Sequence, residues 1–127
     1  MRRHRYLFGG LSLMYLAFAY LQLNDPDPAL WVTLYLVPAA VMAWAATARE
    51  MPRWLPAGLA LAYVALALWW WPARFDGLTG PMNPGTTVEE GRESLGLLIA
   101  ALGLGAAAWL RSYRRAAIPA PAWTGKR

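Results

Sequence analysis

The stretch SLGLLIAALGLGAAAWL, residues 94–110, contains no charged side chain and is bounded by Glu93 and Arg111. Its length is close to the roughly 20 apolar residues that cross the ~30 Å hydrocarbon core of a bilayer as an α-helix. Small residues recur four positions apart along it, as Gly96 and Ala100 do. This spacing lets two helices approach closely in lipid. The stretch therefore predicts a transmembrane helix that packs through small side chains.

Three more uncharged runs precede this one, at residues 7–23, 28–48 and 55–73. The chain has 127 residues, of which 58% are hydrophobic and only 15% charged, and a soluble domain usually carries more charge. We therefore expect an all-α polytopic membrane protein, a bundle of four transmembrane helices forming a single domain at 1–112. The expected spans are about 6–23, 29–48, 54–72 and 89–110, with an outer loop at 73–88 and a flexible basic cytoplasmic tail at 113–127.

The distribution of charge predicts the orientation of these spans. If successive connections lie on alternate sides, ten of the twelve Lys and Arg residues fall on one side and six of the seven Asp and Glu residues on the other. The positive-inside rule then places both termini in the cytoplasm. This topology explains the net charge of +5 without a nucleic-acid partner. The predominance of arginine over lysine and the abundant alanine indicate a bacterial chain, so the expected location is the inner membrane.

The first apolar run also contains Ala17-Phe18-Ala19, a small-x-small pattern typical of signal-peptide cleavage. The run continues past this pattern to Leu23 and is long enough to cross the membrane. We therefore expect it to remain as the first span.

The supply of metal ligands and nucleophiles is small. There is no cysteine, and the only histidine is His4 in the basic N-terminal segment, which argues against thiolate sites, zinc sites and haem. No cofactor is predicted. The metal chemistry left open is an oxygen-ligated divalent cation, Ca²⁺ or Mg²⁺, because carboxylates and amides are the ligands these ions prefer.

Two polar clusters stand at the outer ends of the predicted spans. One lies in QLNDPDPALW, residues 22–31, and the other is EEGRE, residues 89–93. Polar groups near the ends of spans usually face a bundle interior or a wet cavity, so neighbouring spans would bring both clusters into one pocket. The candidate ligand-binding residues are Gln22, Asn24, Asp25, Asp27, Glu89, Glu90, Arg92 and Glu93.

Helix capping accounts for part of these clusters. Asp27 is expected to cap the second span, with Pro28 at the first helical position. Thr87 followed three residues later by Glu90 fits a capping box.

The cluster residues not needed as caps are Asp25, Glu89 and Glu93. A salt-bridged lock with Arg74 and Arg92, including a Glu89–Arg92 pair, is the structural alternative to a binding site.

The same residues carry a resemblance to a known family. Gln22-Leu23-Asn24-Asp25-Pro26-Asp27-Pro28 with Trp31 just after it, and Glu89-Glu90-Gly91-Arg92-Glu93 opening the last span, resemble the transmembrane protein 220 family of small multi-span proteins. The resemblance extends over nearly the whole chain and implies the four-span plan. It implies no reaction and no catalytic residue, because the family has no established biochemical activity.

Three functions remain open from the sequence. The favoured one is a small accessory, binding or scaffold protein whose acidic outer cluster holds a cation or polar ligand. The first alternative is an intramembrane enzyme acting on a lipid or lipid-linked substrate through paired carboxylates, with Glu93 or Asp25 as acid or base. The second is an oligomeric transporter or channel subunit. The expected partners are the lipid bilayer and, through small-residue helix faces such as Gly58 and Ala62, a second copy or a membrane partner protein.

Overall fold

The protein is described by a computed structural model that covers residues 2–79 and 87–116. Within these ranges there are four α-helices and no strand, which confirms the all-α class. The helices are α1 (Arg2–Leu21), α2 (Pro28–Ala46), α3 (Trp54–Trp69) and α4 (Val88–Ala116), and a short 3-10 turn, η1 (Gln22–Asn24), continues α1. Because α4 extends to Ala116, the first residues of the predicted tail are helical; residues 117–127 lie outside the described part.

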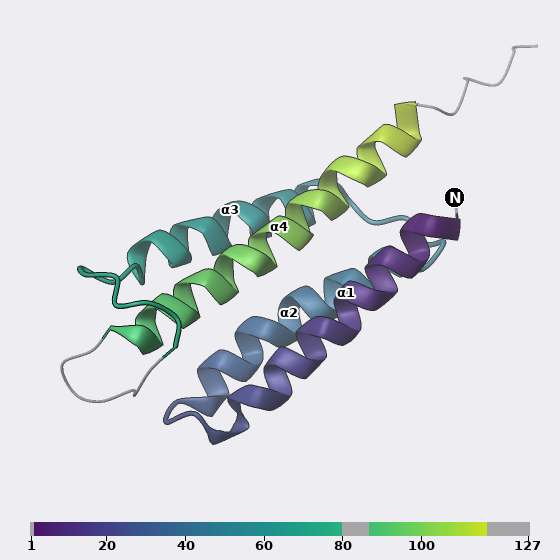
Figure 1. Cartoon of the computed structure of the whole chain (residues 1–127). Helices are drawn as coiled ribbons and strands as arrows, with labels where there is room; N and C mark the ends of the chain where they lie inside the picture. The colour runs from purple at the N-terminus through teal and green to yellow at the C-terminus, as the bar shows by residue number, and fades with distance from the viewer. Residues whose placement is uncertain (1, 80–86, 117–127) are drawn as a thin grey trace, which may run out of the picture.

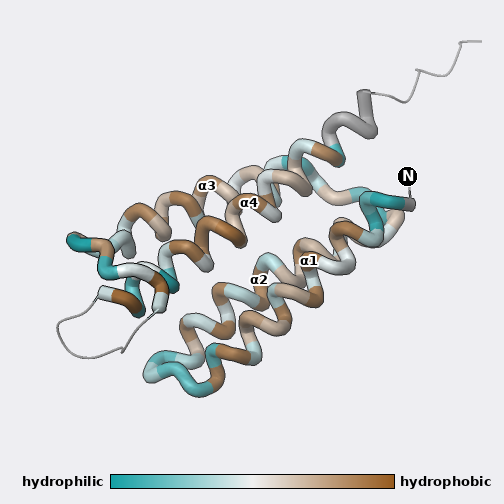
Figure 2. Tube along the Cα trace, in the orientation of Figure 1, coloured by the Kyte–Doolittle hydropathy of each residue, from teal (hydrophilic) through white to brown (hydrophobic). Residues whose placement is uncertain are grey.

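The helices form two antiparallel hairpins, α1–α2 and α3–α4, which lie side by side (Figure 1). The start of α1, the α2–α3 connection and the end of α4 share one end of the bundle, here called the basic end. The α1–α2 connection and the start of α4 share the opposite end, here called the acidic end. Hydrophilic residues gather at these ends, and the helix bodies between them are mostly apolar (Figure 2).

Three helical segments are long and apolar enough to cross a membrane: Arg3–Asn24, Pro28–Ala46 and Val88–Arg111. Helix α3 is apolar but has only 16 residues, about 24 Å at 1.5 Å per residue, which is less than the hydrocarbon thickness. Large side chains such as Leu13, Leu61 and Leu102 are exposed along the helices. Exposed apolar surface of this extent fits contact with lipid.

Glycines on α4 make room for two tyrosines of the other hairpin. A Cβ at Gly103 would lie 2.1 Å from the Tyr15 hydroxyl oxygen, and one at Gly96 would lie 1.9 Å from that of Tyr35. Both tyrosines are buried, and the Tyr15 hydroxyl donates a hydrogen bond of 2.8 Å to the carbonyl of Ile99. Glycine at these two positions therefore sets how closely α4 approaches α1 and α2.

Of the predicted small-residue helix faces, some lie inside the bundle and others on its outer surface. Ala100, one turn after Gly96, is fully buried, so this face packs inside the bundle. Gly58 and Ala62 of α3 are exposed. The expectation that this face of α3 binds a second copy or a membrane partner protein stays a prediction.

Pro38 lies inside α2, and the helix continues through it. Proline has no N–H, so the carbonyl four residues earlier, that of Leu34, loses its helical partner. The Tyr63 hydroxyl of α3 donates a hydrogen bond of 2.6 Å to this carbonyl. A backbone acceptor at membrane depth needs such a partner, and this bond ties the two hairpins together.

Arginines satisfy the last carbonyls of α2 at the basic end. Arg5 Nε donates to the carbonyl of Ala46 at 2.9 Å, and Arg111 donates to that of Ala45 at 3.1 Å. Arg111 also donates to the carbonyl of Arg49. The end of α2, whose final C=O groups have no helical partner, is thus held by α1 and α4.

We predict that Tyr63→Phe destabilises the protein by about 1–3 kcal/mol, because it leaves the Leu34 carbonyl without a partner. In a Pro38→Ala background the helix supplies its own N–H to that carbonyl, so the same substitution should cost much less. The four variants of this cycle can be compared by reversible unfolding in mixed micelles. Equal costs in both backgrounds would contradict the assignment.

Candidate functional site

The α1–α2 connection is held by Asp25 rather than by Asp27. The Asp25 carboxylate accepts a hydrogen bond of 2.9 Å from the backbone N–H of Asp27, which is an Asx turn. Asp27 stands at the N-cap of α2 and Pro28 at its first position, but the Asp27 side chain makes no capping hydrogen bond. The predicted role of Asp27 as a side-chain cap is therefore wrong. Its carboxylate is exposed at the surface of the turn.

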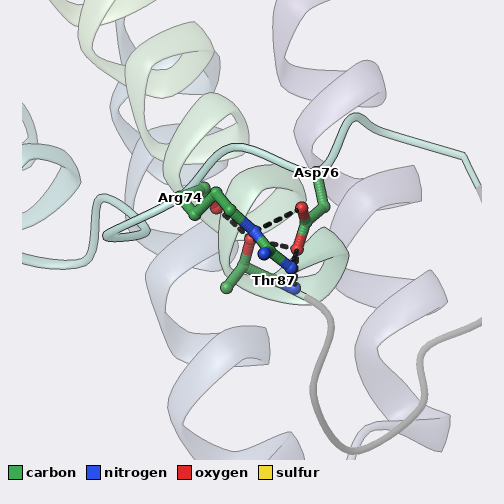
Figure 3. A network of polar contacts seen from close by, with 3 residues as sticks. All are labelled: Arg74, Asp76 and Thr87. Carbon is green, nitrogen blue, oxygen red and sulfur yellow. Dashed lines mark hydrogen bonds and ion pairs between the residues drawn. The ribbon is translucent and has the colours of Figure 1, made fainter.

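A polar network organises the start of α4 (Figure 3). The Asp76 carboxylate accepts the backbone N–H of Thr87 at 3.0 Å and pairs with Arg74 at 2.9 Å. The Thr87 hydroxyl donates to the Arg74 carbonyl. The predicted capping box is wrong, because Asp76 takes the N–H that Glu90 was expected to bind. One carboxylate oxygen of Glu90 is buried and has no hydrogen-bond partner within residues 2–79 and 87–116.

Arg74 was predicted to form salt bridges with the two acidic clusters. It pairs with Asp76 instead. The hydrogen bond from the Thr87 N–H and the Arg74 guanidinium hold the pKa of the Asp76 carboxyl below its ordinary value. This carboxylate is therefore ionised over the whole physiological range. It anchors the start of α4, where the glutamates of the EEGRE cluster stand.

Three carboxylates from the two clusters come together at the acidic end. One oxygen from each of Asp25, Glu89 and Glu93 lies within 4.8 Å of the others. All three side chains are half-buried. Arg92 forms no ion pair with any residue of the described ranges, so the predicted Glu89–Arg92 pair is wrong. These three residues are called the carboxylate triad below.

Two tryptophans position one member of the triad. The indole N–H of Trp70 donates a hydrogen bond of 2.6 Å to the Glu93 carboxylate. The Trp70 ring lies edge-on to that of Trp31, with centroids 5.6 Å apart, and Trp31 is buried. Trp31, part of the motif after the NDPDP turn, thus supports the residue that holds Glu93. No prediction from the sequence linked Trp70 to Glu93, because this contact depends on how α3 packs along α4.

The triad lines a cavity of about 740 Å³ between the α1–α2 turn and the start of α4. Of the predicted residues, Gln22, Asn24, Asp25, Glu89, Arg92 and Glu93 line it, whereas Asp27 and Glu90 do not. The rest of its lining comes from apolar residues of α1 and α4, the buried Tyr35, and Pro26, Leu78 and Thr79 of the two connections. The involvement of Tyr35 was not predicted, because it lies in an apolar run and reaches the cavity only where Gly96 admits its ring. The size is in the range of small-molecule pockets.

A smaller hollow of about 410 Å³ lies at the basic end. It brings one carboxylate, that of Glu50, next to Arg49 and Trp44. No group of carboxylates converges there among the residues described. The cavity at the acidic end is therefore the candidate site.

A bundle of apolar helices with polar groups confined to its ends defines an α-helical membrane protein. The family model described as "Transmembrane family 220, helix" matches residues 14–109. The chain belongs to this transmembrane family, as the NDPDP and EEGRE motifs indicated. Comparisons with curated proteins and with solved structures gave no match.

The pH dependence of stability tests the Asp76 anchor. Because the folded-state pKa of Asp76 is lowered, its contribution to stability is present above the unfolded-state pKa of about 3.9 and is lost as the pH falls through the folded-state value. We predict that wild type exceeds Asp76→Asn in unfolding temperature at pH 7 and that the difference shrinks below about pH 4. Asp27→Asn, which alters an exposed carboxylate, is the control. A pH-independent difference between wild type and Asp76→Asn would contradict this assignment.

Proposed function

We propose that this protein is a non-enzymatic membrane protein that binds a small cationic ligand in the cavity at its acidic end. The observation that carries the proposal is the carboxylate triad, which converges without a basic partner among the described residues. Three carboxylates at this distance repel one another, and a neighbouring positive charge favours their ionised forms. A bound cation would replace the repulsion with attraction.

The cavity offers oxygen ligands of two kinds. The triad supplies carboxylates, and Gln22 and Asn24 add side-chain amides at the wall. This donor set suits a divalent cation such as Ca²⁺ or Mg²⁺, and it equally suits a primary ammonium group, whose N–H donors need several acceptors. The chemistry shared by these ligands is a compact positive charge.

The placement in the membrane supports a site on the outer side. We propose four crossings, with the basic end in the cytoplasm of a bacterial cell, because the Arg-rich connections and both helical termini share that end. Helix α3 is short, but it lies antiparallel along α4 and is followed by Trp70 and Trp71. Tryptophans of this kind anchor a helix end at the headgroup level, and a short helix is accommodated by local thinning of the bilayer.

Binding can be measured by isothermal titration of the purified full chain in neutral detergent with Ca²⁺, Mg²⁺ and butylamine. We expect wild type to bind at least one of these probes. Asp25→Asn, Glu89→Gln and Glu93→Gln should each weaken binding by about tenfold or more, because each removes one charge in direct contact with the cation.

The matched control is Asp27→Asn, which removes a carboxylate from the same turn but outside the cavity. It should leave the affinity unchanged. If wild type binds none of the three probes, or if Asp27→Asn weakens binding as much as the triad variants do, the proposed function fails.

A further inference from the structure

The cavity holds two polar groups that a simple cation would not use. Tyr35 is only 5% exposed and lines the cavity, where its hydroxyl lies against Gly96, another lining residue. This hydroxyl makes no hydrogen bond with any residue of the described part of the chain. The Tyr35 ring is buried, but its hydroxyl oxygen is not among the buried atoms that lack a partner, so it opens to the cavity, where it can donate to a bound oxygen. The ligand that completes this site therefore carries an oxygen acceptor as well as a positive charge.

Arg92 supplies the second group. Its guanidinium borders the same cavity as the triad and forms no ion pair within the described residues. Guanidinium groups bind phosphate with paired hydrogen bonds. The cavity thus presents an anionic triad and a separate cationic group, and this arrangement of charge is complementary to a zwitterion that joins an amine to a phosphate.

An apolar part of the cavity wall reaches the outer surface of the bundle. Phe18 and Leu21 come from α1, and Leu95 and Ile99 from α4. Leu21 is 67% exposed and Ile99 40% exposed. Both side chains therefore belong to the cavity and to the surface that faces lipid, so an apolar chain attached to the ligand would leave the cavity along them.

The cavity also lies at an end of the bundle where exposed aromatic residues gather. Exposed aromatic residues stand at the acidic end, including Tyr20 at the end of α1 and Trp69 and Trp71 at the end of α3. Aromatic belts of this kind mark the membrane–water interface. The triad stands at the same end of the bundle, in the η1–α2 turn and the first two turns of α4.

From these features we propose that the cavity binds the headgroup of a phospholipid that carries a primary amine, with the ammonium group in the triad and the phosphate against Arg92. The Tyr35 hydroxyl donates to a headgroup oxygen, and the acyl chains lie along Leu21 and Ile99. A primary ammonium suits the triad because it donates three hydrogen bonds, whereas a quaternary ammonium donates none and is typically held by an aromatic cage. This inference rests on the proposed cation site and names its ligand.

The test compares short-chain phosphatidylethanolamine with phosphatidylcholine and phosphatidylglycerol of the same chains, titrated into the full-length protein in neutral detergent and followed by native mass spectrometry. We expect phosphatidylethanolamine to bind about tenfold more tightly than the other two. Asp25→Asn and Glu93→Gln should abolish this preference. Arg92→Gln and Tyr35→Phe should weaken phosphatidylethanolamine binding without weakening butylamine binding, because the amine alone has no phosphate and Arg92→Gln removes a positive charge from its surroundings. Asp27→Asn is again the control.

The outcomes separate this inference from the proposed function. If phosphatidylethanolamine binds no better than phosphatidylcholine while Ca²⁺ or butylamine still binds at the triad, the lipid assignment is overturned and cation binding stands. If no probe binds, both fail. If free phosphoethanolamine binds as tightly as the lipid, the ligand is a soluble zwitterion and the lipid assignment is overturned.

Discussion

The carbonyl that Pro38 leaves unpaired in α2 is the constraint on which the relation between the two hairpins depends. Hydrocarbon offers it no water, so the Tyr63 hydroxyl must reach it from α3. This bond links α3 to α2 directly, whereas α3 otherwise packs along α4. Toward the acidic end, Trp31, three residues before Leu34, meets Trp70, seven residues after Tyr63. The indole N–H of Trp70 reaches Glu93. The contacts of Tyr63 and Trp70 thus run from the unpaired carbonyl in the middle of α2 to the Glu93 carboxylate near the start of α4.

The same requirement shapes both ends of the bundle. Arg5 and Arg111, which would be counted as topology signals, satisfy the final carbonyls of α2. Asp76, from the connection between α3 and α4, accepts the N–H of Thr87 at the start of α4. Because Asp76 has this role, the glutamates that follow Thr87 are not needed to cap their own helix. The start of α4 is therefore anchored by a carboxylate that lies outside the triad.

The sequence predicted those features that depend on local composition. Uncharged runs predicted the helices to within a few residues, and the outer position of both acidic clusters predicted that Asp25, Glu89 and Glu93 would meet. It did not predict which groups each side chain contacts. The roles of Asp27 and Glu90 were wrong because a competing acceptor lay elsewhere, in Asp25 and Asp76. Tyr35 was missed because its place depends on the rotation of α2 and on the clearance at Gly96, neither of which a single apolar run reveals.

The distribution of unsatisfied polar groups gives the strongest physical reason to regard the acidic end as functional. Of the three buried side-chain atoms left without a partner in the described residues, two belong to Glu90 and Ser94, on the same first turns of α4 as Glu89 and Glu93, and the third to His4. In the middle of the bundle, by contrast, the Leu34 carbonyl that Pro38 leaves unpaired accepts a hydrogen bond from Tyr63. Leaving buried polar atoms unpaired costs about 1–3 kcal/mol each, and mutually repelling carboxylates add to that cost. The unpartnered atoms of Glu90 and Ser94 lie beside the cavity rather than in its lining. Within the cavity it is the mutual repulsion of Asp25, Glu89 and Glu93 that a bound cation would offset.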